Sequence, residues 1–78
     1  MPRFFFNLRD DVSINDSEGK ELADVEEARE LAVQHARGMM SEDVKAGRLV
    51  LRDEIEVIDE AGRQVMKLPF RDAIEIEE

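Results

Sequence analysis

Apolar and polar residues alternate along the first segment of the chain, from residue 3 to residue 9. The apolar positions of this alternation are Phe4, Phe6 and Leu8. A period of two is typical of a strand with one buried face, so we predict a strand here. Phe5 breaks the pattern because it places an aromatic ring on the outward face. Either a helix end or a loop covers this ring, or the ring belongs to a contact surface.

A helical period follows over residues 25–46. The residues that share one helical face, all apolar except His35, are Val25, Ala28, Leu31, Ala32, His35, Ala36 and Met39. Asp24 is a good N-cap, Glu27 lies three residues further on as in a capping box, and Gly47 offers a C-cap. Acidic residues turn onto the apolar face beyond Met40, so we expect the helix to project past the sheet rather than to break.

The clearest pair of strands comprises residues 54–59 and 64–70, which flank a turn over residues 60–63. Pro69 cannot donate a ladder hydrogen bond, which places its strand at an edge of the sheet. Residues 73–78 alternate again. They predict a further short strand, formed either within this chain or with a neighbouring one.

Two turns share the pattern Asp-x-x-Gly, at residues 16–19 and 59–62. We expect both glycines in the left-handed region of backbone conformation, which glycine adopts without steric cost. Shared turn chemistry explains this similarity better than a duplication does. Val12 and Ile14 precede the first turn at strand spacing, so residues 10–22 form either an ordered hairpin or an open loop.

The order strand, loop, helix and hairpin is typical of the α+β class. We therefore predict a small antiparallel sheet of three to four strands with one long helix packed across one face. The chain has 78 residues, and we expect residues 1–78 to form a single domain.

Composition narrows the ways in which so short a chain is stabilised. A domain of this size has a marginal core and usually needs a staple or a partner. The chain has no cysteine and one histidine, so we expect neither a disulfide nor a metal site. Association with another chain remains as the way to stabilise the domain, and a homodimer is the default expectation. The 42% apolar content and its periodicity argue for a folded chain despite the 40% charged residues.

The net charge of −9 indicates which kinds of binding partner to expect. It disfavours nucleic acid, whose phosphates attract basic surfaces, and it favours a basic partner or none. No segment approaches the roughly 20 apolar residues of a membrane span, and the first residues do not form a signal peptide. We therefore expect an acidic, cytoplasmic protein that contacts neither membrane nor nucleic acid.

No group of residues predicts catalysis. His35 is the only side chain that titrates near neutral pH without perturbation, and we interpret it as a core or interface residue. The acidic residues of the loop after residue 9 lack the order of a calcium-binding loop. No glycine-rich phosphate loop is present. We expect no catalytic residue, no cofactor and no metal ligand.

Apolar residues left over from the predicted core are more informative. These candidates for an interaction surface are Phe5, Val33, Met40, Val44, Ile74 and Ile76. They favour a small non-enzymatic interaction or accessory protein that acts through protein–protein contacts. A small-molecule-binding or regulatory module is the alternative. A core broader than the predicted one would also account for these residues.

The chain resembles a family of short bacterial proteins, found mainly in alphaproteobacteria such as rhizobia, whose shared domain has no assigned function. The matching stretches are Met1-Pro2-Arg3-Phe4-Phe5-Phe6, Asp16-x-x-Gly19-x-Glu21-Leu22-x-Asp24, Glu27-Ala28-Arg29, Asp59-Glu60-Ala61-Gly62-Arg63 and Leu68-Pro69-Phe70. Members of the family usually open with Met-Pro-Arg followed by two aromatic residues, as this chain does. The resemblance covers nearly the whole chain, and it implies no activity and no catalytic residue.

Overall fold

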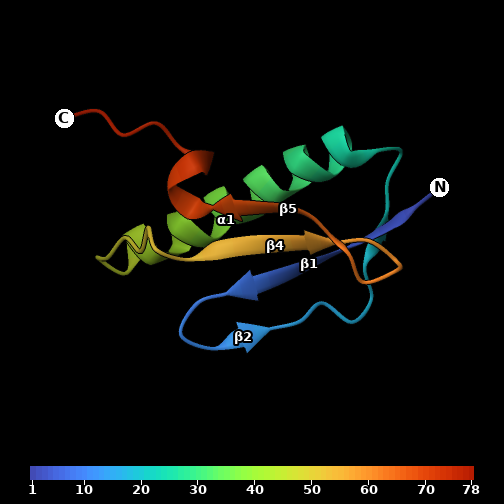
Figure 1. The fold of residues 1–78 in the computed structure, drawn as a ribbon. Coiled ribbons are helices and arrows are strands. Elements are labelled where there is room, and N and C mark those ends of the chain that lie inside the picture. Colours follow the sequence, from blue (N-terminus) through green and yellow to red (C-terminus); the bar gives the residue numbers. More distant parts are fainter.

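A computed structural model describes residues 1–78 as an α+β structure (Figure 1). Its elements in chain order are β1 (Arg3–Arg9), β2 (Ser13–Ile14), β3 (Lys20–Glu21), α1 (Val25–Lys45), β4 (Glu54–Ile58), β5 (Gln64–Pro69) and the 3-10 helix η1 (Phe70–Ala73). The strands form one five-stranded sheet in the order β2-β1-β4-β5, and β3 also pairs with β1. The predicted class and the helix on one face of the sheet are confirmed.

The edge strand beside β1 is divided into two short strands, β2 and β3. Leu8 lies opposite Ile14 of β2, and Phe4 lies opposite Lys20 of β3, both in antiparallel register. Residues 15–19 bulge out between these two short pairings. The segment from residue 10 to residue 22 is therefore neither a regular hairpin nor an open loop.

The pairings of β4 are longer, and that with β1 covers Phe5–Arg9. β4 pairs antiparallel with both β1 and β5, and its pairing with β5 has a register shift between Val57 and Ile58. The turn after β4 closes through the N–H of Asp59, which donates to the carbonyl of Arg63 at 2.9 Å. Pro69 ends β5, which lies at the far edge of the sheet as the sequence predicts.

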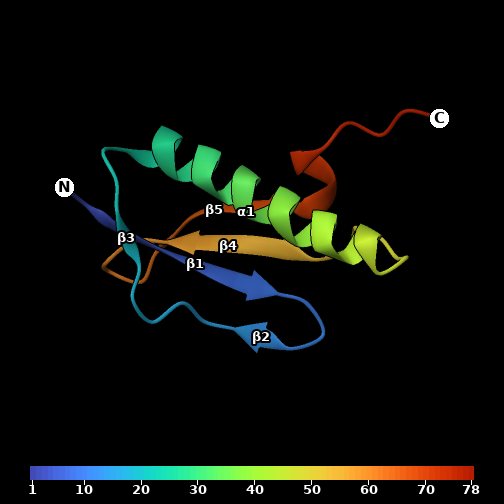
Figure 2. The same cartoon turned by 180° about the vertical axis from the view of Figure 1, so that it is seen from behind.

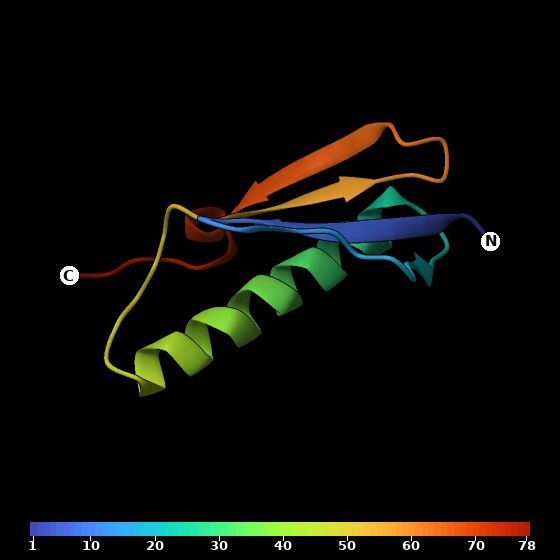
Figure 3. The ribbon, with the colours of Figure 1, turned by 90° about the horizontal axis from the view of Figure 1, so that it is seen from below.

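The start and end of α1 follow the predicted caps. The carboxylate of Asp24 accepts a hydrogen bond from the N–H of Glu27 at 2.9 Å, and Gly47 follows the last turn with φ of +92°. The helix is continuous, and its C-terminal turns diverge from the sheet (Figure 3). The predicted projection of the helix is therefore observed.

The buried face of α1 differs from the predicted one. The buried helical residues are Ala28, Ala32, Ala36 and Met40. Val25, His35 and Met39 were expected in this stripe and are exposed instead. The reason is the position of α1, which packs over β4, β5 and η1 and leaves β1 and β2 to one side (Figure 2). A row of alanines lets the helix lie close to these elements, so the buried stripe is rotated by part of a turn.

The core lies between α1 and the β4–β5 hairpin. Its members are Phe4, Leu22, Ala28, Ala32, Ala36, Met40, Ile55, Val57, Leu68, Phe70 and Ala73. The short helix η1 adds Phe70 and Ala73 to the core, and the Arg37 guanidinium Nε donates to the carbonyl of Ala73 at 2.7 Å. Residues 75–78 are exposed and form no strand in this chain, so that part of the prediction for the tail is wrong.

Candidate interaction surfaces

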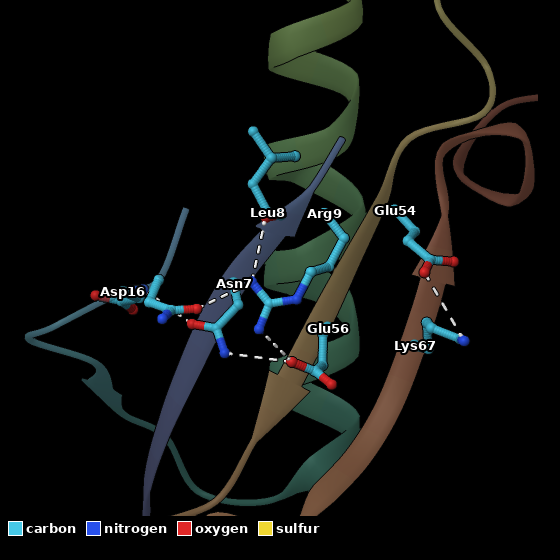
Figure 4. Close-up of polar contacts among 8 residues, drawn as sticks. Asn7, Leu8, Arg9, Asp16, Glu54, Glu56 and Lys67 are labelled. Carbon is cyan, nitrogen blue, oxygen red and sulfur yellow. Dashed lines mark hydrogen bonds and ion pairs between the residues drawn. The ribbon is translucent and has the colours of Figure 1, made fainter. Parts of the chain in front are cut away.

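The face of the sheet that points away from α1 carries a network of polar side chains (Figure 4). The Arg9 guanidinium Nη2 lies 2.8 Å from Glu56 Oε1, and the Asn7 amide Nδ2 donates to the same oxygen at 3.4 Å. Arg9 Nη1 also donates to Asn15 Oδ1 at 2.9 Å. These cross-strand contacts fix the side chains of this face, which we call the open face.

Asn7 and Asp16 hold the split edge strand against β1. Asn7 Oδ1 accepts a hydrogen bond from the N–H of Asp16 at 2.9 Å, and Asp16 Oδ2 accepts one from the N–H of Phe6 at 3.2 Å. Side chains thus replace the ladder hydrogen bonds that residues 15–19 do not make. Asn7 is only 4% exposed, and sequence reasoning missed it because its position in the alternation indicates an outward side chain.

The environment of Asp16 favours its charged form. Burial opposes ionisation, but hydrogen bonds from the backbone N–H groups of Gly19, Phe6 and Glu18 lower the pKa of Asp16 below its usual value. Accepting several N–H donors stabilises a carboxylate relative to the neutral acid. The charge of Asp16 is therefore part of what holds the edge in place.

The open face is hollowed between the two Asp-x-x-Gly turns. A hollow of about 470 Å³ is lined by Phe5, Asn7, Arg9, Asn15, Asp16, Glu56, Ile58, Asp59, Glu60, Gly62 and Gln64. Its lining includes four carboxylates and one cation, so it attracts positive charge. Phe5 points to this face, as predicted, and is half-buried.

A second surface lies beside α1, on the opposite face of the sheet. It is a strip of residues that comprises Phe6 and Leu8 of β1, Ile14 of β2, and His35 and Met39 of α1, and we call this strip the inner groove. The ring of His35 meets that of Phe6 edge to face, with centroids 5.5 Å apart and the ring planes at 68°. Leu8 lies directly opposite Ile14, so these side chains share a face. A shallow hollow of about 500 Å³ beside His35 and Met39 is lined by residues of α1 alone.

The structure scatters the six predicted surface residues. Met40 is 3% exposed and belongs to the core, so its assignment to a contact surface is wrong. Val33 and Ile74 are half-buried against the core, whereas Val44 and Ile76 are exposed. Phe5 lies on the open face, across the sheet from α1. The six residues therefore do not form one surface.

Sequence reasoning missed the inner groove because it assigned Phe6, Leu8 and Met39 to the core. That assignment assumed a helix centred over the sheet. With α1 displaced towards β5, the same side chains are left half-covered or exposed.

A third region, which is polar, lies at the end of the sheet where β4 begins. Asp53 lies in a hollow with Asp10, Asp11 and Asp43, and Arg52 contacts Asp11 at 3.4 Å. Burial, followed by the neighbouring charge of Asp10, raises the pKa of Asp53 above its usual value. This carboxylate is therefore in an environment that disfavours its charge.

A family described as a domain of unknown function (DUF6894) matches residues 3–71. No curated protein and no solved structure shows significant similarity to the chain. None of the helices combines the length and the apolar character that a membrane crossing requires.

Proposed function

Since the chain belongs to the DUF6894 family, whose function is unknown, we propose on physical grounds that it is a non-enzymatic interaction protein that works as a homodimer. The inner groove is the proposed dimer interface. The proposal places the protein in the cytoplasm of a bacterium, in line with its acidic composition and the alphaproteobacterial resemblance of its opening motif.

The observation that carries the proposal is the uncovered apolar half of the inner sheet face. α1 covers β4 and β5, whereas Phe6 and Leu8 of β1 are half-buried and Ile14 of β2 is exposed. Burying apolar surface contributes about 25 cal/mol per Å². A partner seated on this half of the sheet would complete the apolar layer that α1 begins.

The molecule also exposes more surface than its mass requires. Its accessible surface is 5370 Å², whereas a compact monomer of this mass exposes about 4,900 Å². Its radius of gyration is 12.8 Å, against about 11.5 Å for a compact domain of this length. A standard interface buries about 800 Å² per partner. The excess of about 500 Å² is smaller than this area and includes the exposed tail of residues 75–78, so it is compatible with association.

A second copy fits the inner groove because the groove offers both kinds of contact. α1 contributes His35 and Met39, and the sheet contributes Phe6, Leu8 and Ile14, with the rings of His35 and Phe6 in contact. In a twofold dimer the same patch meets itself, so the helical residues of each copy can cover the sheet residues of the partner. The net charge of −9 opposes self-association, which predicts a tighter dimer as added salt screens it.

The test is the mass in solution by light scattering across a dilution series, for the wild type and two variants. Ile14→Lys places a charge in the inner groove. Ile76→Lys makes the same change in the tail, where the side chain is equally exposed, at 54%. We expect the wild type and Ile76→Lys to dimerise with similar affinity, and Ile14→Lys to be weakened about tenfold or more, which is roughly 1.4 kcal/mol.

A monomeric wild type at all concentrations and at high salt would contradict the proposal. Equal weakening by both variants would also contradict it, because the charge alone would then account for the effect. Thermal unfolding of each variant checks that the fold is intact.

A small-molecule-binding or regulatory module is the second candidate, and the hollow on the open face is the site where it would bind its ligand. Small-molecule pockets are mostly apolar and enclose their ligand. This hollow is open, and only Phe5 and Ile58 among its lining residues are hydrophobic. It therefore suits a polar group presented by a larger partner better than a free small molecule.

A further inference from the structure

We propose that the hollow of the open face binds an arginine side chain from a basic segment of a partner protein. This inference is independent of the proposed dimer, because the hollow and the inner groove lie on opposite faces of the sheet. Three features of the hollow carry it: a fixed aromatic ring, an excess of carboxylates, and two acceptor oxygens left free by the surrounding contacts.

The aromatic ring is Phe5, and the first Asp-x-x-Gly turn holds it. A Cβ atom added to Gly19 would lie 2.8 Å from Phe5 Cε2 and 2.9 Å from the carbonyl oxygen of Phe4. Only glycine allows the turn to approach so closely. The ring is thereby positioned before any partner arrives, and an arginine guanidinium can stack on an aromatic ring that is fixed in this way.

The charge of the lining is complementary to a cation. Arg9 is the only basic residue among the eleven that line the hollow, and the Glu56 carboxylate already pairs with it at 2.8 Å. Asp16, Asp59 and Glu60 add three further carboxylates. The net charge of −9 on the whole chain extends the attraction, because it steers a basic segment towards the protein before contact.

The hydrogen bonds identify which oxygens remain for a partner. Both oxygens of Asp16 and both of Asp59 accept hydrogen bonds from within the protein. Glu56 uses Oε1 for Arg9 and Asn7, and its Oε2 accepts none. Glu60 uses Oε1 for the N–H of Arg3, and its Oε2 also accepts none. A guanidinium above Phe5 would therefore find its acceptor at Glu56 or Glu60, supported by the general negative charge of the turns.

The experiment is a calorimetric titration with hexa-arginine and hexa-lysine peptides at moderate salt. Gln64 lines the hollow, whereas Gln34 lies on α1, and both are exposed. We expect the wild type to bind hexa-arginine at least about threefold more tightly than hexa-lysine, because only the guanidinium stacks. Gln64→Lys should weaken hexa-arginine binding by about tenfold, and Gln34→Lys, with the same charge change, by much less.

A second variant separates stacking from charge. Phe5→Leu keeps an apolar side chain and should remove the preference for hexa-arginine, because it weakens hexa-arginine binding more than hexa-lysine binding. Equal binding of the two peptides to the wild type would overturn the proposal. Equal weakening by Gln64→Lys and Gln34→Lys would overturn it as well, because binding would then reflect only the overall charge.

Discussion

The turns at residues 16–19 and 59–62 share a sequence pattern and a local structure but act at different ranges. In both, Oδ1 of the aspartate accepts N–H hydrogen bonds from the turn, and the glycine has a positive φ, of +69° at Gly19 and +82° at Gly62. The two turns differ in the partner of the second carboxylate oxygen, Oδ2. Asp59 Oδ2 pairs with Arg63 inside its own turn, whereas Asp16 Oδ2 accepts the N–H of Phe6 in β1.

This difference follows from the strands that each turn joins. The turn at 59–62 closes a hairpin in which β4 and β5 are already paired along their lengths. The turn at 16–19 connects β2 and β3, which have two residues each. A split edge has few ladder hydrogen bonds of its own, so side chains must attach it to the sheet. The same motif therefore stabilises only its own turn at residues 59–62, whereas at residues 16–19 it also attaches the edge strand to β1.

The largest difference in stability between the two turns is expected when the glycine of each is replaced by alanine. Gly19→Ala combines a strained φ with a Cβ that meets Phe5 and the Phe4 carbonyl oxygen, whereas the Cβ of Gly62→Ala enters open space. We expect a loss of roughly 3 kcal/mol or more at residue 19 and of about 1 kcal/mol at residue 62. Urea unfolding measures both. Similar losses would show that the close approach to Phe5 has no energetic role.

A smaller contrast is expected for the two aspartates. Asp16→Asn replaces the oxygen that accepts from the N–H of Phe6 by a donor, and should lower stability by about 1–3 kcal/mol. Asp59→Asn disturbs only its own turn and should lower the Tm less. Thermal unfolding at pH 7 compares the two, and an equal or greater effect at residue 59 would contradict the tertiary role of Asp16.

The Asp16→Asn variant should also change how stability depends on pH. The pKa of Asp16 is lowered in the folded protein from its ordinary value of 3.8. Its contribution is therefore complete above pH 3.8 and is lost as the pH falls through the folded pKa. The difference in stability between the wild type and Asp16→Asn should shrink over that range. A constant difference would show that the charge of Asp16 is irrelevant.

Asp53 is the opposite case and should give the smallest effect. Its pKa is raised, first by burial and then by Asp10, so its ionisation opposes folding as the pH rises above 3.8. Asp53→Asn should raise the Tm at pH 7 by about 1–3 °C. The gain should vanish at pH values where the wild-type carboxyl is protonated. A lower Tm at pH 7 would contradict this assignment.

Local patterns in the sequence account for most of the fold. The alternation of β1, the caps of α1 and the turn of the β4–β5 hairpin each depend on neighbouring residues, and all were predictable. The buried stripe of α1 was not, because it depends on where the helix lies across the sheet. The role of Asn7 was not either, since its partner Asp16 comes from a loop whose path the sequence does not indicate.

The candidate surfaces divide in the same way. The outward position of Phe5 follows from strand alternation, whereas the inner groove arises only from the displacement of α1 towards β5. Met40 was predicted to lie on a surface and is buried instead, because the helix is rotated by part of a turn relative to the prediction. Surfaces that depend on the relative position of two elements require the tertiary structure.

The most direct test of the proposed dimer is an isotope-filtered NOE experiment on a mixture of labelled and unlabelled protein. The sample is held at a concentration and salt at which light scattering gives the mass of the dimer. We expect intermolecular NOEs among the side chains of Leu8, Ile14, His35 and Met39. Intermolecular NOEs confined to other residues, such as Val44 or Ile76, would contradict the inner groove as the interface.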